Sequence, residues 1–209
     1  NIWGKDISHL KGKTTRSRLA PIRYDTVEIP QELKMRHQNI MLCMDTMYIN
    51  KIQFLMSIGI PIYYRTCNII ENATSKEYYK AVDKILRVYN KGGYTITTIE
   101  CDREYKLLLD KVCDGMRTTM NYTNAQEHEG HAERNIRTIK ESFRVALHRT
   151  GYSTIPKTMI QALAELCADR LNMFPAKHWI SSYYSPDAMV TQKVLDYGKH
   201  CTYLFGEYG

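Results

Sequence analysis

The sequence predicts an α/β fold in which helices cover a mixed five-stranded sheet. Three consecutive β-type runs indicate an antiparallel meander. The helix that follows them leads to another strand, and such a helical crossover adds parallel pairing to the sheet. Two long helical patterns in the second half of the chain supply cover for the sheet. The length of 209 residues and the 44% hydrophobic content suit one domain of ordinary size with extensions.

Short β-rich runs bounded by turn residues predict the strands. The five strands span residues 40–50, 51–62, 63–70, 94–101 and 117–122. Short polar or Gly/Pro breaks separate the first three runs, so an antiparallel meander is their simplest arrangement. Asp102 closes the fourth run.

Four segments carry helical signals. The first begins at the capping box Thr74-Ser75-Lys76-Glu77 and ends at Gly92-Gly93. The other three helices are expected over residues 105–113, 129–149 and 156–172. The apolar stripe of the longest helix consists of Ile136, Ile139, Phe143 and Leu147.

The chain divides into a basic N-terminal arm (1–38), a core (39–174) and a C-terminal extension (175–209). The arm lacks a hydrophobic period and is expected to be extended. Its basic cluster consists of Lys11, Lys13, Arg16 and Arg18. The extension is rich in Tyr, Ser and Gly, and we expect irregular or short β structure there.

Net charge and cysteine usage narrow the class of protein. The formal charge of +7 and the pI near 9.0 favour an anionic partner, with nucleic acid as the leading candidate over a merely basic protein. Six scattered cysteines without a Cys-x-x-Cys pair fit reduced core thiols. No apolar run reaches membrane-spanning length and no signal-peptide pattern opens the chain. We therefore expect an intracellular segment of a longer polyprotein.

Three acidic residues stand out by their position. Asp45 interrupts the apolar run 40–49, and a carboxylate placed there must be paired, hydrogen-bonded or bound to a metal ion. Asp102 ends a strand, and Glu133 lies on the longest helix. Taken singly, Asp45 fits a core aspartate held by backbone donors or a strand whose acid faces water, Asp102 fits a turn residue, and Glu133 fits a surface ion pair with Arg137.

Together, the three acids could converge on one divalent cation site. Mg²⁺ or Mn²⁺ suits carboxylate oxygens, and bound cations relieve the repulsion among the acids. Two such ions, typically about 3.5 to 4 Å apart, support phosphoryl transfer without a serine or cysteine nucleophile.

Basic residues continue along the helix that carries Glu133. Steps of four, seven and eleven residues from Glu133 lead to Arg137, Lys140 and Arg144, which therefore share its helix face. This spacing predicts a track for phosphate groups beside the acids.

Two segments resemble the integrase catalytic core of retroviruses and long-terminal-repeat retrotransposons, particularly the copia-type branch. The first is Glu-His-Glu-Gly-His-Ala-Glu-Arg-Asn-Ile-Arg-Thr-Ile-Lys at 127–140, which is similar to the helix that carries the third acid. The second is Ser-Pro-Asp-Ala-Met at 185–189, followed by Leu-Asp-Tyr at 195–197 and Phe-Gly at 205–206. The resemblance covers about residues 39–174 and extends into the tail.

The resemblance implies a ribonuclease H-like fold in which Asp45, Asp102 and Glu133 bind two Mg²⁺ ions. It further implies trimming of DNA 3′ ends and their joining to target DNA, a homo-oligomer, and a nuclear location in a eukaryotic host. The interval from Asp102 to Glu133, 133 − 102 = 31 positions, is shorter than is usual in the family. Glu127 and Glu129 remain rivals of Glu133 as third ligand.

A zinc module is not expected. His9 and His37 have no Cys-x-x-Cys downstream, and His128 and His131 have a metal-like spacing without cysteine partners. Two other functions remain open: a non-catalytic DNA-binding remnant of a retroelement polyprotein, and a ribonuclease H-like hydrolase of RNA/DNA hybrids.

Overall fold

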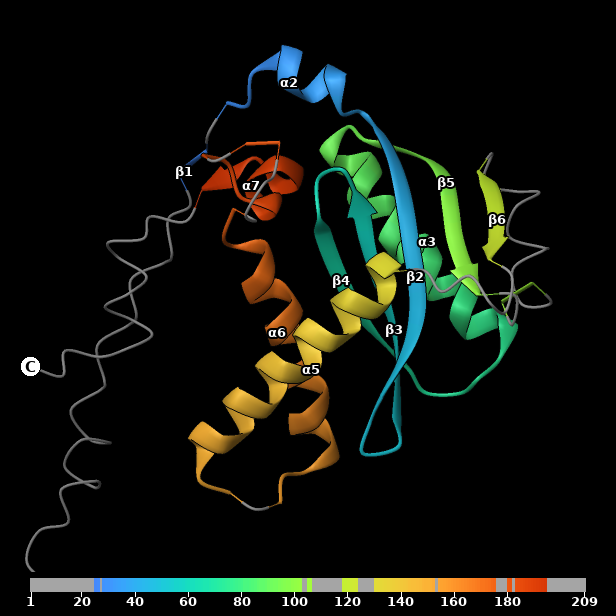
Figure 1. Cartoon of the computed structure of the whole chain (residues 1–209), viewed down its shortest axis with the longest axis vertical. Coiled ribbons are helices and arrows are strands. Elements are labelled where there is room, and N and C mark those ends of the chain that lie inside the picture. Colours follow the sequence, from blue (N-terminus) through green and yellow to red (C-terminus); the bar gives the residue numbers. More distant parts are fainter. Residues whose placement is uncertain are drawn as a thin grey trace, which may run out of the picture.

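The computed structural model is built around a five-stranded sheet with strand order β4-β3-β2-β5-β6 (Figure 1). Its strands are β2 (Asn39–Ile49), β3 (Ile52–Ile60), β4 (Tyr64–Ile70), β5 (Thr95–Asp102) and β6 (Thr119–Thr123). The structure describes residues 25–26, 28–102, 105–106, 118–123, 130–152, 154–175, 180–181 and 183–194. The mixed five-stranded sheet flanked by helices confirms the predicted fold class.

Strand directions follow the predicted meander and crossover. β2 pairs antiparallel with β3, and β3 with β4. After a helical crossover, β5 pairs parallel with β2, and β6 pairs parallel with β5. β2 thus lies at the centre of the sheet, between an antiparallel and a parallel neighbour.

Helices cover both faces of the sheet because β2 is apolar on both sides. One face of β2, which includes Leu42 and Met44, packs with α3 (Ser75–Gly92). The other face carries Cys43 and Met47 and packs under the two C-terminal helices, α5 (Gly130–Thr150) and α6 (Lys157–Asn172). Figure 1 shows α5 crossing in front of β2 and β3 while α3 lies behind the sheet.

The predicted capping signals set the ends of α3. The Thr74 hydroxyl accepts a hydrogen bond from the Glu77 backbone N–H at 3.4 Å. At the other end Gly93 adopts φ +82°, a left-handed conformation that favours glycine. The helix therefore starts and stops where its sequence signals predict.

Two terminal segments differ from prediction. Residues 31–36, expected to be extended, form α2 (Gln31–Arg36), because Pro30 leads into a run of good helix formers and Leu33 packs against the core. In the C-terminal extension, α7 (Pro186–Thr191) follows the N-cap residue Ser185, whose hydroxyl accepts a hydrogen bond from the Ala188 backbone N–H at 3.1 Å. Beyond it, β7 (Lys193–Val194) pairs antiparallel with β1 (Asp25–Thr26), which agrees with the expected short β structure.

Other expectations fall partly or wholly outside the described residues. The predicted helix 105–113 is described only at residues 105–106. The cysteines within the described ranges are buried thiols, as expected: Cys43, Cys67, Cys101 and Cys167. No described helix combines the length and the apolar character needed to cross a bilayer.

A buried polar latch fixes both C-terminal helices to β4. Asn172 of α6 accepts from the Arg65 backbone N–H and donates to the Arg65 carbonyl, both at 2.8 Å. Arg65 in turn donates through Nε to Asn135 Oδ1 of α5 at 3.1 Å. Asn135 and Asn172 are almost fully buried, so these bonds fix how the helices sit on the sheet.

We expect Asn172→Ala to lower the free energy of unfolding by about 1–3 kcal/mol, because it leaves two backbone groups of Arg65 without their partner. Urea unfolding followed by circular dichroism measures the change. The matched control is Asn90→Ala on the exposed side of α3, which should not lower stability. Equal losses in both variants would contradict the role of the latch.

Candidate metal and nucleic-acid site

Parallel pairing of β2 with β5 brings Asp45 and Asp102 next to each other. Met44 and Cys101 are register partners, and the two aspartates are the next residues along the two strands. Neighbouring strands lie about 4.8 Å apart, and residues at the same level of parallel strands point to the same face. The first two acids of the predicted triad are therefore side by side.

The two aspartates differ in exposure. Asp102 is exposed, while Asp45 is half-buried and accepts a hydrogen bond from the Thr46 backbone N–H at 2.6 Å. Asp45 shares its face of β2 with Cys43 and Met47, the face on which α5 packs. The carboxylate was expected to need compensation for burial in an apolar strand, but Asp45 is only half-buried, so water has access to it.

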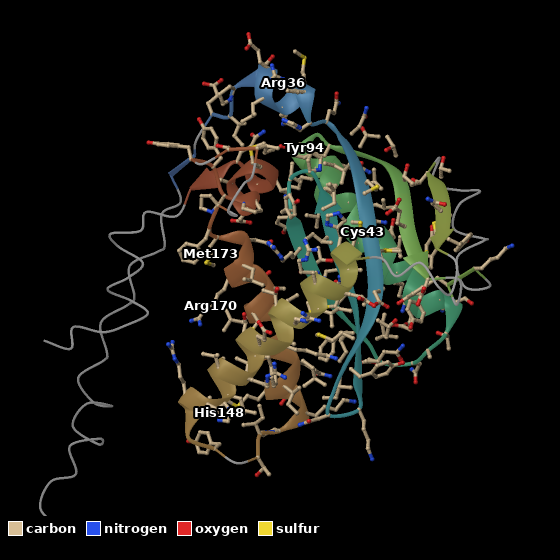
Figure 2. The ribbon with its side chains drawn as sticks, viewed as in Figure 1. Arg36, Cys43, Tyr94, His148, Arg170 and Met173 are labelled. Atoms are coloured by element: carbon tan, nitrogen blue, oxygen red, sulfur yellow. The ribbon has the colours of Figure 1, made fainter. Side chains whose placement is uncertain are left out.

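The first turns of α5 lie over β2 and β3. Ala132 packs with Cys43 and Ile58 in a small apolar cluster. Figure 2 labels Cys43 on β2 beside the beginning of α5, and His148 near the far end of that helix. The segment that carries Glu133 is thus placed close to the middle of the sheet.

The orientation of Glu133 follows from helix geometry. Asn135, two residues later, turns toward β4, where it bonds Arg65. Residues two apart on a helix differ by about 200° around its axis, so Glu133 lies on the opposite flank. Because β5 lies on that side of β2, exposed Glu133 is on the flank nearer the two aspartates.

The three acids do not form a preassembled metal site. Within the described ranges, no group of three His, Cys, Asp or Glu side chains is gathered so that it could hold a metal ion. Asp45 and Asp102 alone still suit Mg²⁺, which usually keeps several waters and is bound by one or two carboxylates together with substrate phosphates. The rival ligands Glu127 and Glu129 lie outside the described residues.

Basic side chains lie on the same flank of α5 as Glu133. At about 100° per residue, Arg137, Lys140 and Arg144 fall within about 40° of Glu133 around the helix. Arg137 and Arg144 are exposed, and Lys140 is half-buried. The basic residues expected in the arm, Lys11, Lys13, Arg16 and Arg18, lie outside the described residues.

One neighbour of the acids was not found by sequence reasoning. The hydroxyl groups of Tyr105 and Thr46 are hydrogen-bonded, and Thr46 directly follows Asp45. Burial raises the pKa of Tyr105, and the negative charge of Asp45 raises it further. The sequence predicts Tyr105 only as the start of a helix, and its position three residues after Asp102 is the signal that could have linked it to the acids.

The sequence matches no family model and no curated protein. Among solved structures, the chain is similar to the catalytic core domain of BIV integrase, with a TM-score of 0.54 and 15% identity over 78% of this chain and 97% of that one. It is also similar to the HTLV-2 integrase catalytic core domain, solved in complex with magnesium in a trimeric form. That match has a TM-score of 0.53 and 12% identity, and covers 74% and 96% of the two chains. The chain therefore has the ribonuclease H-like fold of retroviral integrase cores.

We expect Asp102→Asn to raise the free energy of unfolding by about 0.2–1 kcal/mol without divalent metal, because it removes one of two like charges on adjacent strands. Thermal or urea unfolding at low ionic strength measures the gain, which should shrink as salt screens the repulsion. The control is Asp83→Asn, which loses an ion pair with Arg87 at 2.8 Å and should not gain stability. A change in stability that does not depend on salt would contradict repulsion between the two carboxylates.

Proposed function

We propose that this chain is a retrotransposon integrase core of the copia type, a Mg²⁺-dependent polynucleotidyl transferase that processes DNA 3′ ends and joins them to target DNA. The observation that carries this proposal is the Asp45–Asp102 pair on adjacent parallel strands, on the face that α5 covers. The integrase-core fold and the basic flank of α5 support it. Composition alone could not select this reaction, because a basic protein can bind nucleic acid without cleaving it.

In this proposal Asp45 and Asp102 hold divalent cations, and Glu133 completes the ligand set once cation and DNA phosphate are present. The bound cations would supply Lewis-acid activation of the attacking oxygen and neutralise the leaving oxygen. Arg137, Lys140 and Arg144 hold the phosphate backbone in line with the acids. A water attacks the phosphorus in end processing and a 3′ hydroxyl attacks it in joining. In each step the bond from phosphorus to the leaving 3′ oxygen breaks, the attacking oxygen gives its proton to solvent and the leaving oxygen takes one up, so no side chain forms a covalent bond to DNA.

A non-catalytic DNA-binding remnant is the second candidate, because the described residues contain no gathered group of three acids. Such a protein would bind DNA through α5 without cleaving it. A ribonuclease H-like hydrolase would use the same acids on an RNA/DNA hybrid. Comparing joining of a DNA end with hydrolysis of a hybrid, both with Mg²⁺, separates these functions.

The proposal also includes self-association, a nuclear location in a eukaryotic host and a protein without zinc. The HTLV-2 core that resembles this chain was solved in a trimeric form and in complex with magnesium. Sedimentation of the chain with and without DNA tests its oligomeric state, and metal analysis of the purified protein tests for zinc.

We expect Asp45→Asn to abolish Mg²⁺-dependent nicking and strand joining, since it replaces a charged ligand by a neutral amide of the same shape. Gel assays on a labelled DNA end measure both activities. DNA binding should be retained, because the phosphate contacts come from α5. Unchanged joining by Asp45→Asn would contradict the catalytic proposal.

We expect the double variant Arg137→Ala/Lys140→Ala to bind DNA more weakly and to lower the slope of log K against log salt by about 2, one for each lost phosphate contact. Fluorescence anisotropy over a salt series measures the slope. The matched control, Lys76→Ala/Lys91→Ala, removes the same charge from exposed positions on α3, on the opposite face of the sheet. If both double variants show the same slope of log K against log salt, the DNA does not bind along α5.

A further inference from the structure

We infer that Tyr105 is a positioning residue that, through Thr46, holds Asp45 and Asp102 in register for cation binding. This inference rests on the proposed function, because it assigns a residue that orients the same pair of acids. It concerns the hydroxyl group of Tyr105 rather than its ring.

Thr46 links the carboxylate to the tyrosine. Its backbone N–H donates to Asp45 Oδ1 at 2.6 Å, and its side-chain hydroxyl is hydrogen-bonded to the Tyr105 hydroxyl. The two contacts lie on one residue, so a shift of Thr46 moves the donor that orients the Asp45 carboxylate. Groups that orient ligands from behind usually affect metal affinity about 10- to 100-fold.

Tyr105 is itself held firmly. Tyr105 is only 4% exposed, and its ring packs edge-to-face against Tyr78 of α3, with ring centroids 5.6 Å apart and an interplanar angle of 84°. Packing of this kind fixes the ring but leaves the phenol oxygen in need of a partner. Thr46 provides that partner, which explains why a hydroxyl is tolerated at this depth.

The Thr46–Tyr105 hydrogen bond also restrains Asp102, because Tyr105 is close to Asp102 in the sequence. Asp102 is the last residue of β5, and Tyr105 follows it by three positions. Tying Tyr105 to Thr46 therefore ties the chain beyond Asp102 to the residue beyond Asp45. The parallel ladder ends near the two acids, since the last register partners are Met44 and Cys101. The side-chain bond extends the connection between the strands past the last of these partners.

The experiment measures Mn²⁺ affinity of the full chain by electron paramagnetic resonance of free Mn²⁺. Tyr105→Phe keeps the buried ring and removes the hydroxyl, and Thr46→Val removes the other end of the bond. We expect each variant to lose about tenfold in affinity, and the double variant to lose no more than either single variant, because all three lack the same bond. Thr46→Ser, which retains a hydroxyl, should bind Mn²⁺ as the unmodified chain does.

Tyr78→Phe is the matched control, because it removes a hydroxyl from the other ring of the aromatic pair. Its Mn²⁺ affinity should be unchanged. Losses that multiply in the double variant, or an unchanged affinity in Tyr105→Phe, would overturn the positioning role. If the unmodified chain shows no Asp45-dependent Mn²⁺ binding, the proposed function fails and the positioning role falls with it. Asp45-dependent binding that Tyr105→Phe leaves intact overturns the positioning role alone.

Discussion

The parallel pairing of β2 with β5 is the constraint on which the rest of the site depends. It requires the α3 crossover from β4 to β5, because these two strands run in the same direction and cannot be joined by a short turn. It also sets Met44 level with Cys101, and through that register it places Asp45 beside Asp102. A slip of one residue in β2 would turn Asp45 to the α3 face and bury it in the larger apolar core. The register that buries the apolar residues of β2 is therefore the same register that places the two acids side by side.

The second requirement is the rotation of α5. An apolar stripe alone permits small rolls of a helix on a sheet, whereas a buried side chain with defined hydrogen bonds restricts them. Asn135 accepts a hydrogen bond from Arg65 of β4 and donates one to the Ser57 carbonyl of β3, so Glu133 and the basic residues lie on the other flank of α5. Asn172 anchors α6 to the same strand. The polar latch on one flank of α5 thus determines which charges the other flank presents.

Much of this architecture can be read from local sequence signals. The meander, the capped ends of α3 and the stripe on α5 depend on periodicity and on capping chemistry, both of which are local. The latch and the Thr46–Tyr105 bond could not be predicted, because each joins residues far apart in the chain and neither produces a periodic pattern in the sequence. α2 and α7 were missed because helices of about six residues carry too few apolar repeats, although Ser185-Pro186, the N-cap and first residue of α7, is a helix-start signal.

The central claim, a divalent cation site at Asp45 and Asp102, is tested most directly by anomalous diffraction from crystals of the chain grown with Mn²⁺. The account predicts an anomalous peak between the two carboxylates, with metal–oxygen distances of roughly 2.0–2.2 Å, and its loss in Asp45→Asn crystals. The same data locate Glu133 relative to the ion. A Mn²⁺ peak only at other residues, or none near Asp45 at saturating Mn²⁺, would contradict the account.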